Sequence, residues 1–320
     1  MKSPFPYFGG KATVARQVWA ALGQPKHYIE PFFGSGAVLL ARPHWKQGMI
    51  ETVNDADVML CNVWRSLQFA PEGVARWCDW PVDHCELMAR KSSIIKNEGR
   101  LVEGLAADPE FHDAKQAGYW IWAASCWIGS GLTLPGQIPH VSDGGKGVHA
   151  LGQRPHVSNG GMVTDPYNTH LYTWFRQLSE RLRYVRVVCG DWKRVCGGSW
   201  QDKCGDVGIF MDPPYAGGIG RDEDIYHKES TTVAAEVNAW CLERGAIPSY
   251  RIVIAGYEEH ENLLSHGWTA HNWKATGGYG NTSRNGADSP GNQNRKRETL
   301  YFSPHCLGKN LFDVAVGEGE

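Results

Sequence analysis

An apolar run stops abruptly in the stretch VGIFMDPPYAGG, residues 207–218. The run Val207–Met211 predicts a strand that is buried on both faces of a sheet. Proline has no N–H to donate to a neighbouring strand, so Pro213 and Pro214 must end it. Because ligands of open α/β sheets bind at the carboxyl ends of the strands, Asp212 stands where a ligand is expected. Taken alone, an Asp-Pro pair is also typical of an ordinary turn.

The tetrad Asp212–Tyr215 combines a carboxylate, two prolines and an aromatic ring. Each proline fixes its own φ angle and lacks a backbone donor, so the rim is stiff and its carbonyls meet little local competition. The carboxylate and a carbonyl provide two acceptors, and the ring provides a stacking surface. This combination favours a planar amine, which would be held by both of its hydrogens and by the face of its ring.

Segments with strand and helix patterns alternate through most of the chain. Apolar residues with helical spacing mark Ala56–Gln68, and residues 232–245 form another helix pattern that closes on Gly245. Strands that alternate with helices predict a mostly parallel sheet covered on both faces. We expect the strands within the segments 26–36, 49–55, 184–192, 207–211, 251–257, 267–276 and 297–303.

The segment 71–166 breaks this alternation. Two helical stretches come first, ending in the aromatic sequence YWIWAASCWIGSG. A long polar segment follows at Leu132–Gly161, and long segments without regular structure are usually functional or disordered. We interpret residues 71–166 as an insertion between the second and third strands.

Glycine or acidic residues follow four of the predicted strands. The turn Gly34–Gly36 is not a G-x-G-x-x-G motif, which argues against a nicotinamide cofactor. Asp55 ends the next strand about twenty residues on, where an acid binds ribose hydroxyls in nucleoside-binding folds; a helix N-cap is the alternative. Asp191 and Trp192 end the third strand, where they would bind and stack on an adenine ring. Together with Asp212, these residues predict one nucleoside-bearing cofactor.

The composition excludes several classes of protein. The chain has 320 residues, a net charge of −2 and no apolar run of membrane-spanning length. This net charge argues against a strongly nonspecific polyanion binder. The nine cysteines include no C-x-x-C pair, so we expect reduced thiols and no metal site. The sequence MKSPFPYFGGK lacks the apolar stretch of a signal peptide, and we therefore expect a cytoplasmic protein.

Three motifs occur in a fixed order: PYFGGK at 6–11, EPFFGSG at 30–36 and DPPY at 212–215. In this set and order they resemble the Dam-type adenine-N6 DNA methyltransferases, especially the phage-type enzymes. The segments ATGGYGN at 275–281 and RETLYFSPHC at 297–306 are similar to the C-terminal part of the phage branch. Glu30 replaces the aspartate that is more usual in the second motif.

The resemblance implies a class I methyltransferase fold, which is Rossmann-like: a mostly parallel seven-stranded sheet with an antiparallel hairpin at one edge. The last two predicted strands would form that hairpin. Residues 1–70 and 167–310 would form the S-adenosylmethionine-binding catalytic domain, and residues 311–320 a C-terminal tail. The insertion at 71–166 would be a mainly helical target-recognition region.

The resemblance also implies S-adenosyl-L-methionine as the cofactor. Glu30–Gly36 would pass its methionine end, Asp55 would bind its ribose and Asp191 its adenine. Phe8 and Lys11 would close the site, with Lys11 on the methionine carboxylate; the alternative for Lys11 is a solvated lysine at a helix start. The implied cofactor-binding residues are Phe8, Lys11, Glu30, Pro31, Phe32, Gly34, Ser35, Gly36, Asp55, Asp191 and Trp192.

The implied catalytic residues are Asp212, Pro213, Pro214 and Tyr215. The lone pair of the adenine amino group is delocalised into the ring, so this group is a poor nucleophile. Asp212 and the carbonyl of Pro213 would accept its two hydrogens and favour a pyramidal nitrogen for direct in-line transfer. The target base must leave the duplex, and Tyr215 would stack on it.

Double-stranded DNA is the implied partner. Side chains of the Leu132–Gly161 loop would read bases or contact phosphates, and the run 277–297 would grip phosphates. The first group comprises Gln137, His140, Lys146, Gln153, Arg154 and Asn159, and the second comprises Arg284, Arg295, Lys296 and Arg297. For each of these side chains, a solvated loop position is the alternative.

Two other interpretations stay open at this point. The same fold accepts a different target, cytosine N4 or adenine in RNA, because Asp-Pro-Pro-Tyr also fits other amino-methyltransferases. A protein that binds the cofactor or DNA without methyl transfer belongs to a different class. The intact tetrad argues against that class, since a silent protein has no need of Asp212.

Overall fold

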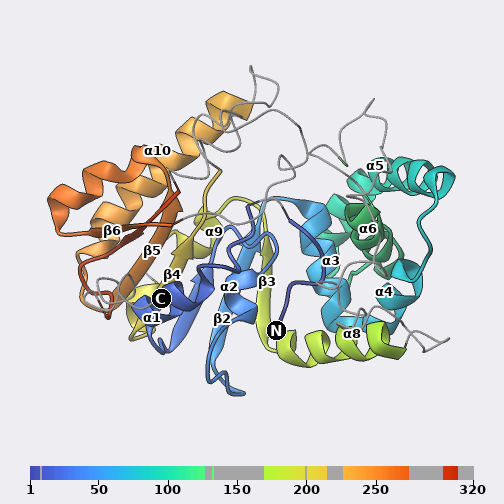
Figure 1. Cartoon of the computed structure of the whole chain (residues 1–320), viewed down its shortest axis with the longest axis horizontal. Coiled ribbons are helices and arrows are strands. Elements are labelled where there is room, and N and C mark those ends of the chain that lie inside the picture. The colour runs from blue at the N-terminus through green and yellow to red at the C-terminus, as the bar shows by residue number, and fades with distance from the viewer. Residues whose placement is uncertain are drawn as a thin grey trace, which may run out of the picture. The chain divides into compact units, whose positions relative to one another are not determined.

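The computed structural model describes residues 1–7, 9–126, 132, 169–198, 200–214, 226–273 and 298–308. Seven strands form one sheet in the order β3-β2-β1-β4-β5-β7-β6 (Figure 1). They are β1 (His27–Glu30), β2 (Ile50–Asp55), β3 (Val185–Cys189), β4 (Val207–Met211), β5 (Tyr250–Gly256), β6 (Thr269–Asn272) and β7 (Thr299–Phe302). Each lies within a segment predicted to hold a strand, except that β5 begins one residue early, at Tyr250.

Strand β1 stands within the parallel part of the sheet. It pairs in parallel with β2 on one side and with β4 on the other, and β4 pairs in parallel with β5. Strand β7 is antiparallel to both β5 and β6, which confirms the predicted antiparallel edge. After β1, the chain first adds β2 and β3 on one side of β1 and then adds β4 and β5 on the other side. This reversal puts a topological switch point between β1 and β4, where ligands of such sheets bind.

Helices connect most of the strands. The α-helices are α1 (Ala15–Leu22), α2 (Ala37–Leu40), α3 (Val58–Phe69), α4 (Pro71–Cys78), α5 (His84–Ala107), α6 (Ala114–Cys126), α8 (Thr169–Leu182), α9 (Lys193–Cys196) and α10 (Tyr226–Gly245). Two 3-10 helices are η1 (Gln201–Lys203) and η2 (Glu258–His266). Helix α10 ends at Gly245 as predicted but begins earlier than the predicted start at Thr232. Together with the sheet, these helices confirm the predicted α/β class.

The chain divides into two compact units. The first comprises residues 1–10, 34–40 and 54–194, and the second comprises residues 11–33, 41–53 and 195–320. The predicted division into a catalytic domain, a recognition region at 71–166 and a tail at 311–320 stays a prediction.

Three described helices of the first unit occupy the segment where the sequence predicted two. Pro71 begins α4, where its missing N–H costs no hydrogen bond. Asp83 caps α5, because its carboxylate accepts the backbone N–H of Glu86 at 2.7 Å. These two start signals separate α4 from α5.

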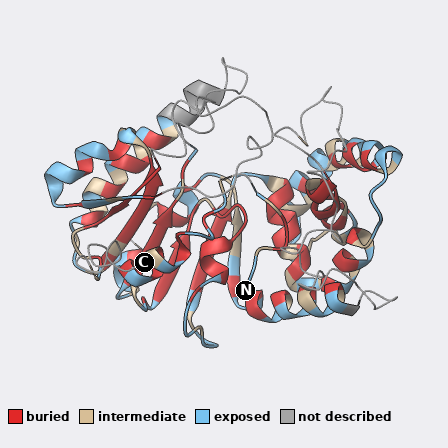
Figure 2. Ribbon diagram, in the orientation of Figure 1, coloured by how far each residue is buried: buried red, intermediate tan, exposed pale blue. Residues whose placement is uncertain are grey.

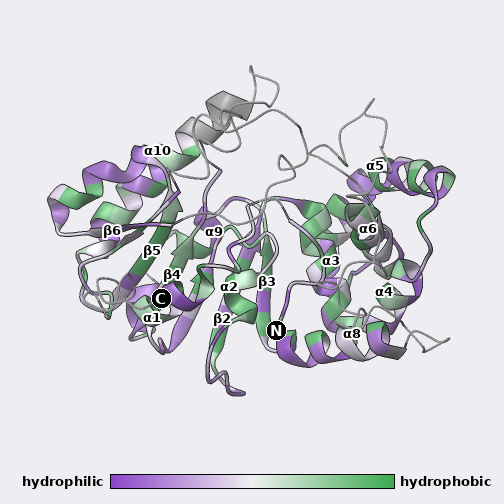
Figure 3. Ribbon diagram, in the orientation of Figure 1, coloured by the Kyte–Doolittle hydropathy of each residue, from purple (hydrophilic) through white to green (hydrophobic). Residues whose placement is uncertain are grey.

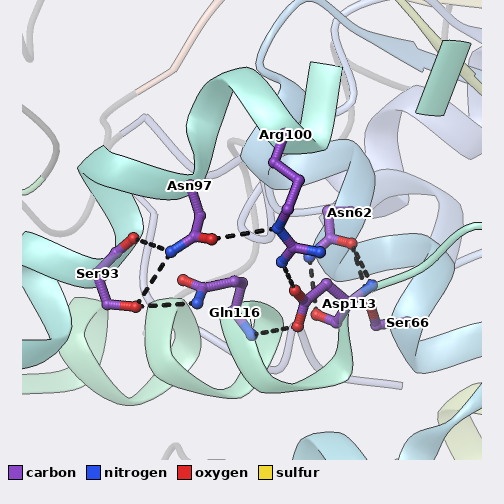
Figure 4. Close-up of polar contacts among 7 residues, drawn as sticks. All are labelled: Asn62, Ser66, Ser93, Asn97, Arg100, Asp113 and Gln116. Atoms are coloured by element: carbon purple, nitrogen blue, oxygen red, sulfur yellow. Dashed lines mark hydrogen bonds and ion pairs between the residues drawn. The ribbon is translucent and has the colours of Figure 1, made fainter. Parts of the chain in front are cut away.

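A polar network joins α3, α5 and α6 within the first unit (Figure 4). The Asn62 side chain donates to the Asp113 carbonyl at 3.0 Å and accepts the Asp113 N–H at 2.8 Å. The Asp113 carboxylate accepts the N–H of Gln116 at 2.9 Å, which satisfies a donor in the first turn of α6, and it pairs with Arg100. The network thereby fixes the start of α6 against α3 and α5. Its members are Asn62, Ser66, Ser93, Asn97, Arg100, Asp113 and Gln116.

The core of the second unit centres on β4 and β5. Every residue of β4 is buried, and so is every residue of β5 except Arg251 (Figure 2). Both strands are mainly hydrophobic (Figure 3). Large side chains such as Phe210 and Tyr250 are fully buried, and each contributes about 1.5–3 kcal/mol by leaving water. Within the described ranges, every helix is too short or too polar to cross a membrane.

Candidate active site

The turn after β1 has a conformation that favours glycine. Gly34 has a φ of +47° and Gly36 a φ of +64°, in the left-handed region where a Cβ is costly. A Cβ on Gly34 would also lie 2.8 Å from the ring of Tyr7. The indole of Trp64 donates to the Gly34 carbonyl at 3.0 Å. The turn is therefore fixed by backbone geometry and by a buried donor, and both glycines are buried.

Asp55 binds this turn through its carboxylate. Its Oδ2 accepts the backbone N–H of Gly34 at 2.8 Å, and its Oδ1 accepts that of Asp57 at 2.9 Å. Burial raises the pKa of Asp55 to about 6, although both backbone hydrogen bonds act in the opposite direction. The backbone N–H of Ala56 acts on the carboxylate as well. Asp55 is therefore bound to the turn after β1 and to the residues before α3 through backbone donors.

Asp57, and not Asp55, caps helix α3. The Asp57 carboxylate accepts the N–H of Met59 at 2.7 Å and that of Leu60 at 3.2 Å. The N-cap alternative for Asp55 is therefore wrong. Its role as a ribose ligand stays a prediction.

The turn after β3 is tied to Asp55 as well. The N–H of Gly190 donates to the Asp55 carbonyl at 2.8 Å, and the Asn54 side chain donates to the Gly190 carbonyl at 2.9 Å. The first unit therefore joins Gly34, Asp55 and Gly190 by direct hydrogen bonds. Three of the predicted strand-end features meet there: the glycine turn, the acid of β2 and the start of the Gly-Asp-Trp sequence.

The two side chains that follow Gly190 differ in exposure. Asp191 is exposed, and its carboxylate accepts the N–H of Lys193 at 2.8 Å, so a ligand can reach it. Trp192 is only 4% exposed, so little of its ring is left to stack on a ligand. Of these two predicted contacts to the cofactor adenine, the structure favours Asp191.

Lys11 and Asp212 form a buried ion pair in the second unit. Nζ of Lys11 lies 3.0 Å from Oδ2 of Asp212, and the two side chains are 4% and 21% exposed. Lys11 precedes α1, whereas Asp212 directly follows β4. The alternative of a solvated lysine at a helix start is therefore wrong. The structure gives Lys11 a carboxylate of the protein as its partner, so a methionine carboxylate would have to join or replace Asp212.

The other residues of the second motif and of the tetrad are described only in part. Glu30 is buried and accepts the hydroxyl of Tyr28 at 2.8 Å. Pro31 and Pro213 are buried, and Pro214 is exposed. Several predicted site residues lie outside the described residues: Phe8, Gln137, Lys146, Arg154, Tyr215, Arg284, Arg295, Lys296 and Arg297.

Sequence reasoning missed Glu298. This residue precedes β7, is 8% exposed, and carries a carboxylate whose pKa burial raises. Lys11 attracts the carboxylate and Asp212 repels it, so all three groups belong to one electrostatic cluster. A signal was present: an antiparallel strand begins at the edge where parallel strands end, and an acid at its start therefore lies at the ligand-binding edge.

No group of three or more His, Cys, Asp or Glu side chains in the described ranges is arranged to hold a metal ion. The nine cysteines are free thiols.

The family model of the D12 class N6 adenine-specific DNA methyltransferases matches residues 7–76. This segment contains Lys11, the turn Gly34–Gly36 and Asp55, and it ends before Asp212. The match confirms the family predicted from the motifs, and this family indicates an enzyme that methylates N6 of adenine in DNA. The narrower description as phage-type stays a prediction. No curated protein sequence matches the chain.

Proposed function

We propose that this chain, an adenine-specific DNA methyltransferase by its family match, takes the methyl group from S-adenosyl-L-methionine and transfers it to a flipped adenine of double-stranded DNA. The observation that carries the proposal is Asp212. It is a half-buried carboxylate at the carboxyl end of β4, next to the switch point of the sheet, and two prolines follow it. This placement supports a role for Asp212 in holding a weak amine nucleophile.

The residues of the first unit fit a nucleoside-bearing cofactor. The glycine turn lies at the carboxyl end of β1, where a ligand of such a sheet is expected, and Gly34 and Gly36 lack side chains that would limit its approach. Asp55 would bind the ribose, and Asp191 would accept from the adenine amino group. When bound, S-adenosylmethionine supplies an electrophilic methyl group on a sulfonium.

The residues of the second unit would act on the target amine. Asp212 and the carbonyl of Pro213 would each accept one hydrogen bond from the amine. These two bonds would favour a pyramidal nitrogen, whose lone pair is no longer conjugated with the ring. When the amine takes the methyl group, the S–CH3 bond of the sulfonium would break and the sulfur would keep its electron pair. The carboxylate of Asp212 would stabilise the positive charge that the nitrogen gains, until one N–H proton passes to water. Lys11 balances the charge of Asp212 while no substrate is bound, since a buried carboxylate without a partner is costly.

The target base would be held outside the duplex by stacking. Extruding a base costs a few kcal/mol, and stacking on an aromatic ring returns about 1–3 kcal/mol per base. Tyr215, next to the two prolines, is our candidate for this ring. Arg284, Arg295, Lys296 and Arg297 would hold phosphates, while Gln137, Lys146 and Arg154 would read base edges. We place the reaction in the cytoplasm, where the DNA of a bacterial or phage-infected cell lies.

The test is a methyl-transfer assay with purified full-length chain, S-adenosylmethionine carrying a labelled methyl group, and unmethylated double-stranded DNA. Digestion to nucleosides and mass spectrometry should show label in N6-methyladenine. Label in N4-methylcytosine, or in RNA only, would identify a different acceptor. Cofactor binding without transfer to either nucleic acid would instead indicate the silent binding protein.

A further inference from the structure

Glu298 is a buried carboxylate that the methyl-transfer chemistry described so far does not use. Its side chain is 8% exposed, and its Oε2 has no hydrogen-bond partner among the described residues. Its backbone is fixed, because the Glu298 carbonyl accepts the N–H of Trp273 at 3.1 Å. An acceptor left without a partner inside a protein costs free energy, so such a group calls for an explanation.

The sheet brings Glu298 to the edge that carries Asp212. Met211, the residue before Asp212, pairs with Ile254 of β5, and Ile254 pairs with Tyr301 of β7. Since β7 runs antiparallel to β4 and β5, its first residue lies toward the carboxyl ends of those two strands. Glu298, which precedes that residue, is therefore at the same edge as Asp212.

Among the described residues, the charges that act on Glu298 come from the ion pair of Lys11 and Asp212. Lys11 lies before α1 and attracts the carboxylate, and Asp212 lies after β4 and repels it. The ammonium of Lys11 thus attracts two carboxylates, and in this structure it forms its ion pair with Asp212. A buried ammonium needs a counter-charge in every state of the site.

We propose that Glu298 is a positioning residue that receives the ammonium of Lys11 when the target amine engages Asp212. The proposal rests on the function proposed above. As the amine donates to Asp212, the ammonium moves from Oδ2 of Asp212 toward the Glu298 carboxylate and keeps its proton throughout. This exchange frees an acceptor on Asp212 while Lys11 keeps a carboxylate as its counter-charge. No covalent bond forms or breaks in it.

The experiment is a double-mutant cycle on the full-length chain with Glu298→Gln and Lys11→Met. Glu298→Gln should lower kcat on the order of tenfold, with the KM for S-adenosylmethionine within about twofold of wild type. In the Lys11→Met background, the same substitution should change kcat by less than about twofold, because Glu298 acts through Lys11. Glu298→Asp keeps the charge and should restore part of kcat. Glu261→Gln, which removes an exposed carboxylate of η2, is the matched control and should leave kcat unchanged.

Thermal unfolding of the same four proteins without cofactor gives a readout that does not depend on activity. Lys11→Met should lower Tm more in the wild-type background than in the Glu298→Gln background. In the wild type the substitution removes the attraction between Lys11 and Glu298, whereas in Glu298→Gln that attraction is already absent. Additive changes in Tm and multiplicative losses of kcat would overturn the role of Glu298 while leaving the methyltransferase proposal intact. A wild-type chain that methylates no adenine would overturn both.

Discussion

The carboxylate cluster of the first unit and that of the second unit are held in different ways. In the first unit, Asp55 is held by backbone N–H groups of Gly34 and Asp57, and burial raises its pKa to about 6. In the second unit, Asp212 is held by the side chain of Lys11. Backbone donors are fixed by the fold, whereas a lysine side chain can change partner. The first arrangement suits a group that binds the same ligand atoms throughout, and the second suits a group whose partner changes during the reaction.

The largest expected effect is that of Asp212→Asn. The amide keeps the size of the side chain but loses the charge that stabilises the developing cation, so kcat should fall by about 10²–10³-fold. Calorimetry should show cofactor affinity close to that of wild type. Asp206→Asn, at the exposed start of β4, is the control and should leave kcat unchanged. Near-normal turnover of Asp212→Asn would remove Asp212 from the mechanism.

Asp55→Asn should weaken cofactor binding, the quantity that Asp212→Asn leaves close to wild type. Cofactor binding should weaken by about 1.5–3 kcal/mol, because the hydroxyls of the ribose lose a charged acceptor. The effect should depend on pH in the wild type. The pKa of Asp55 is about 6, so the carboxylate is charged above this value and cofactor affinity should fall as the pH drops through it. Calorimetry across this range should give a flat profile for Asp55→Asn; an equally steep profile in the variant would assign the titration to another group.

The raised pKa of Asp55 also determines how folding stability changes with pH. Because the folded-state pKa of Asp55 is higher than its unfolded value of about 3.9, protonation favours the folded state. The stability that Asp55 contributes is therefore fully present below about pH 4 and lost as the pH rises through 6. Binding and folding thus depend on pH in opposite directions at this residue.

Gly34→Ala tests the rigidity of the first cluster. The substitution puts a Cβ at positive φ and 2.8 Å from Tyr7, so unfolding in denaturant should show a loss of about 1–3 kcal/mol. Gly48→Ala is a matched control, since Gly48 also has a positive φ, +94°, but nothing lies within 4 Å of its added Cβ. The difference between the two variants isolates the clash with Tyr7. Equal losses would mean that Tyr7 moves aside at little cost.

The smallest effect is expected for Asp57→Ala. The variant loses the N-cap of α3, which should cost about 0.5–2 kcal/mol of stability. Cofactor affinity should stay within about twofold of wild type, because the cap faces the helix. A loss of affinity as large as that of Asp55→Asn would show that the two acids act as one unit.

The sequence allowed the strands and their ends to be predicted, because a buried strand leaves a local pattern. Val207–Met211 is apolar and stops at two prolines, and this pattern needs no knowledge of the rest of the chain. The pairing of Lys11 with Asp212 leaves no such pattern, since it depends on how α1 and β4 pack. Glu298 did have a signal, an acid at the start of a strand expected to be antiparallel, but its burial beside Lys11 and Asp212 depends on tertiary packing.

The insertion of β7 between β5 and β6 has a consequence for how the protein is made. A ribosome delivers β5 and β6 before β7. Among the described strands, β6 pairs with β7 alone, and β7 is the outer neighbour of β5. In the second unit, β5 and β6 therefore cannot take their places beside β7 until residues near 300 have been synthesised. The cluster of Lys11, Asp212 and Glu298 can form only then. Nascent chains shorter than this would expose an open strand edge, which is prone to aggregation, and would lack a complete acceptor site.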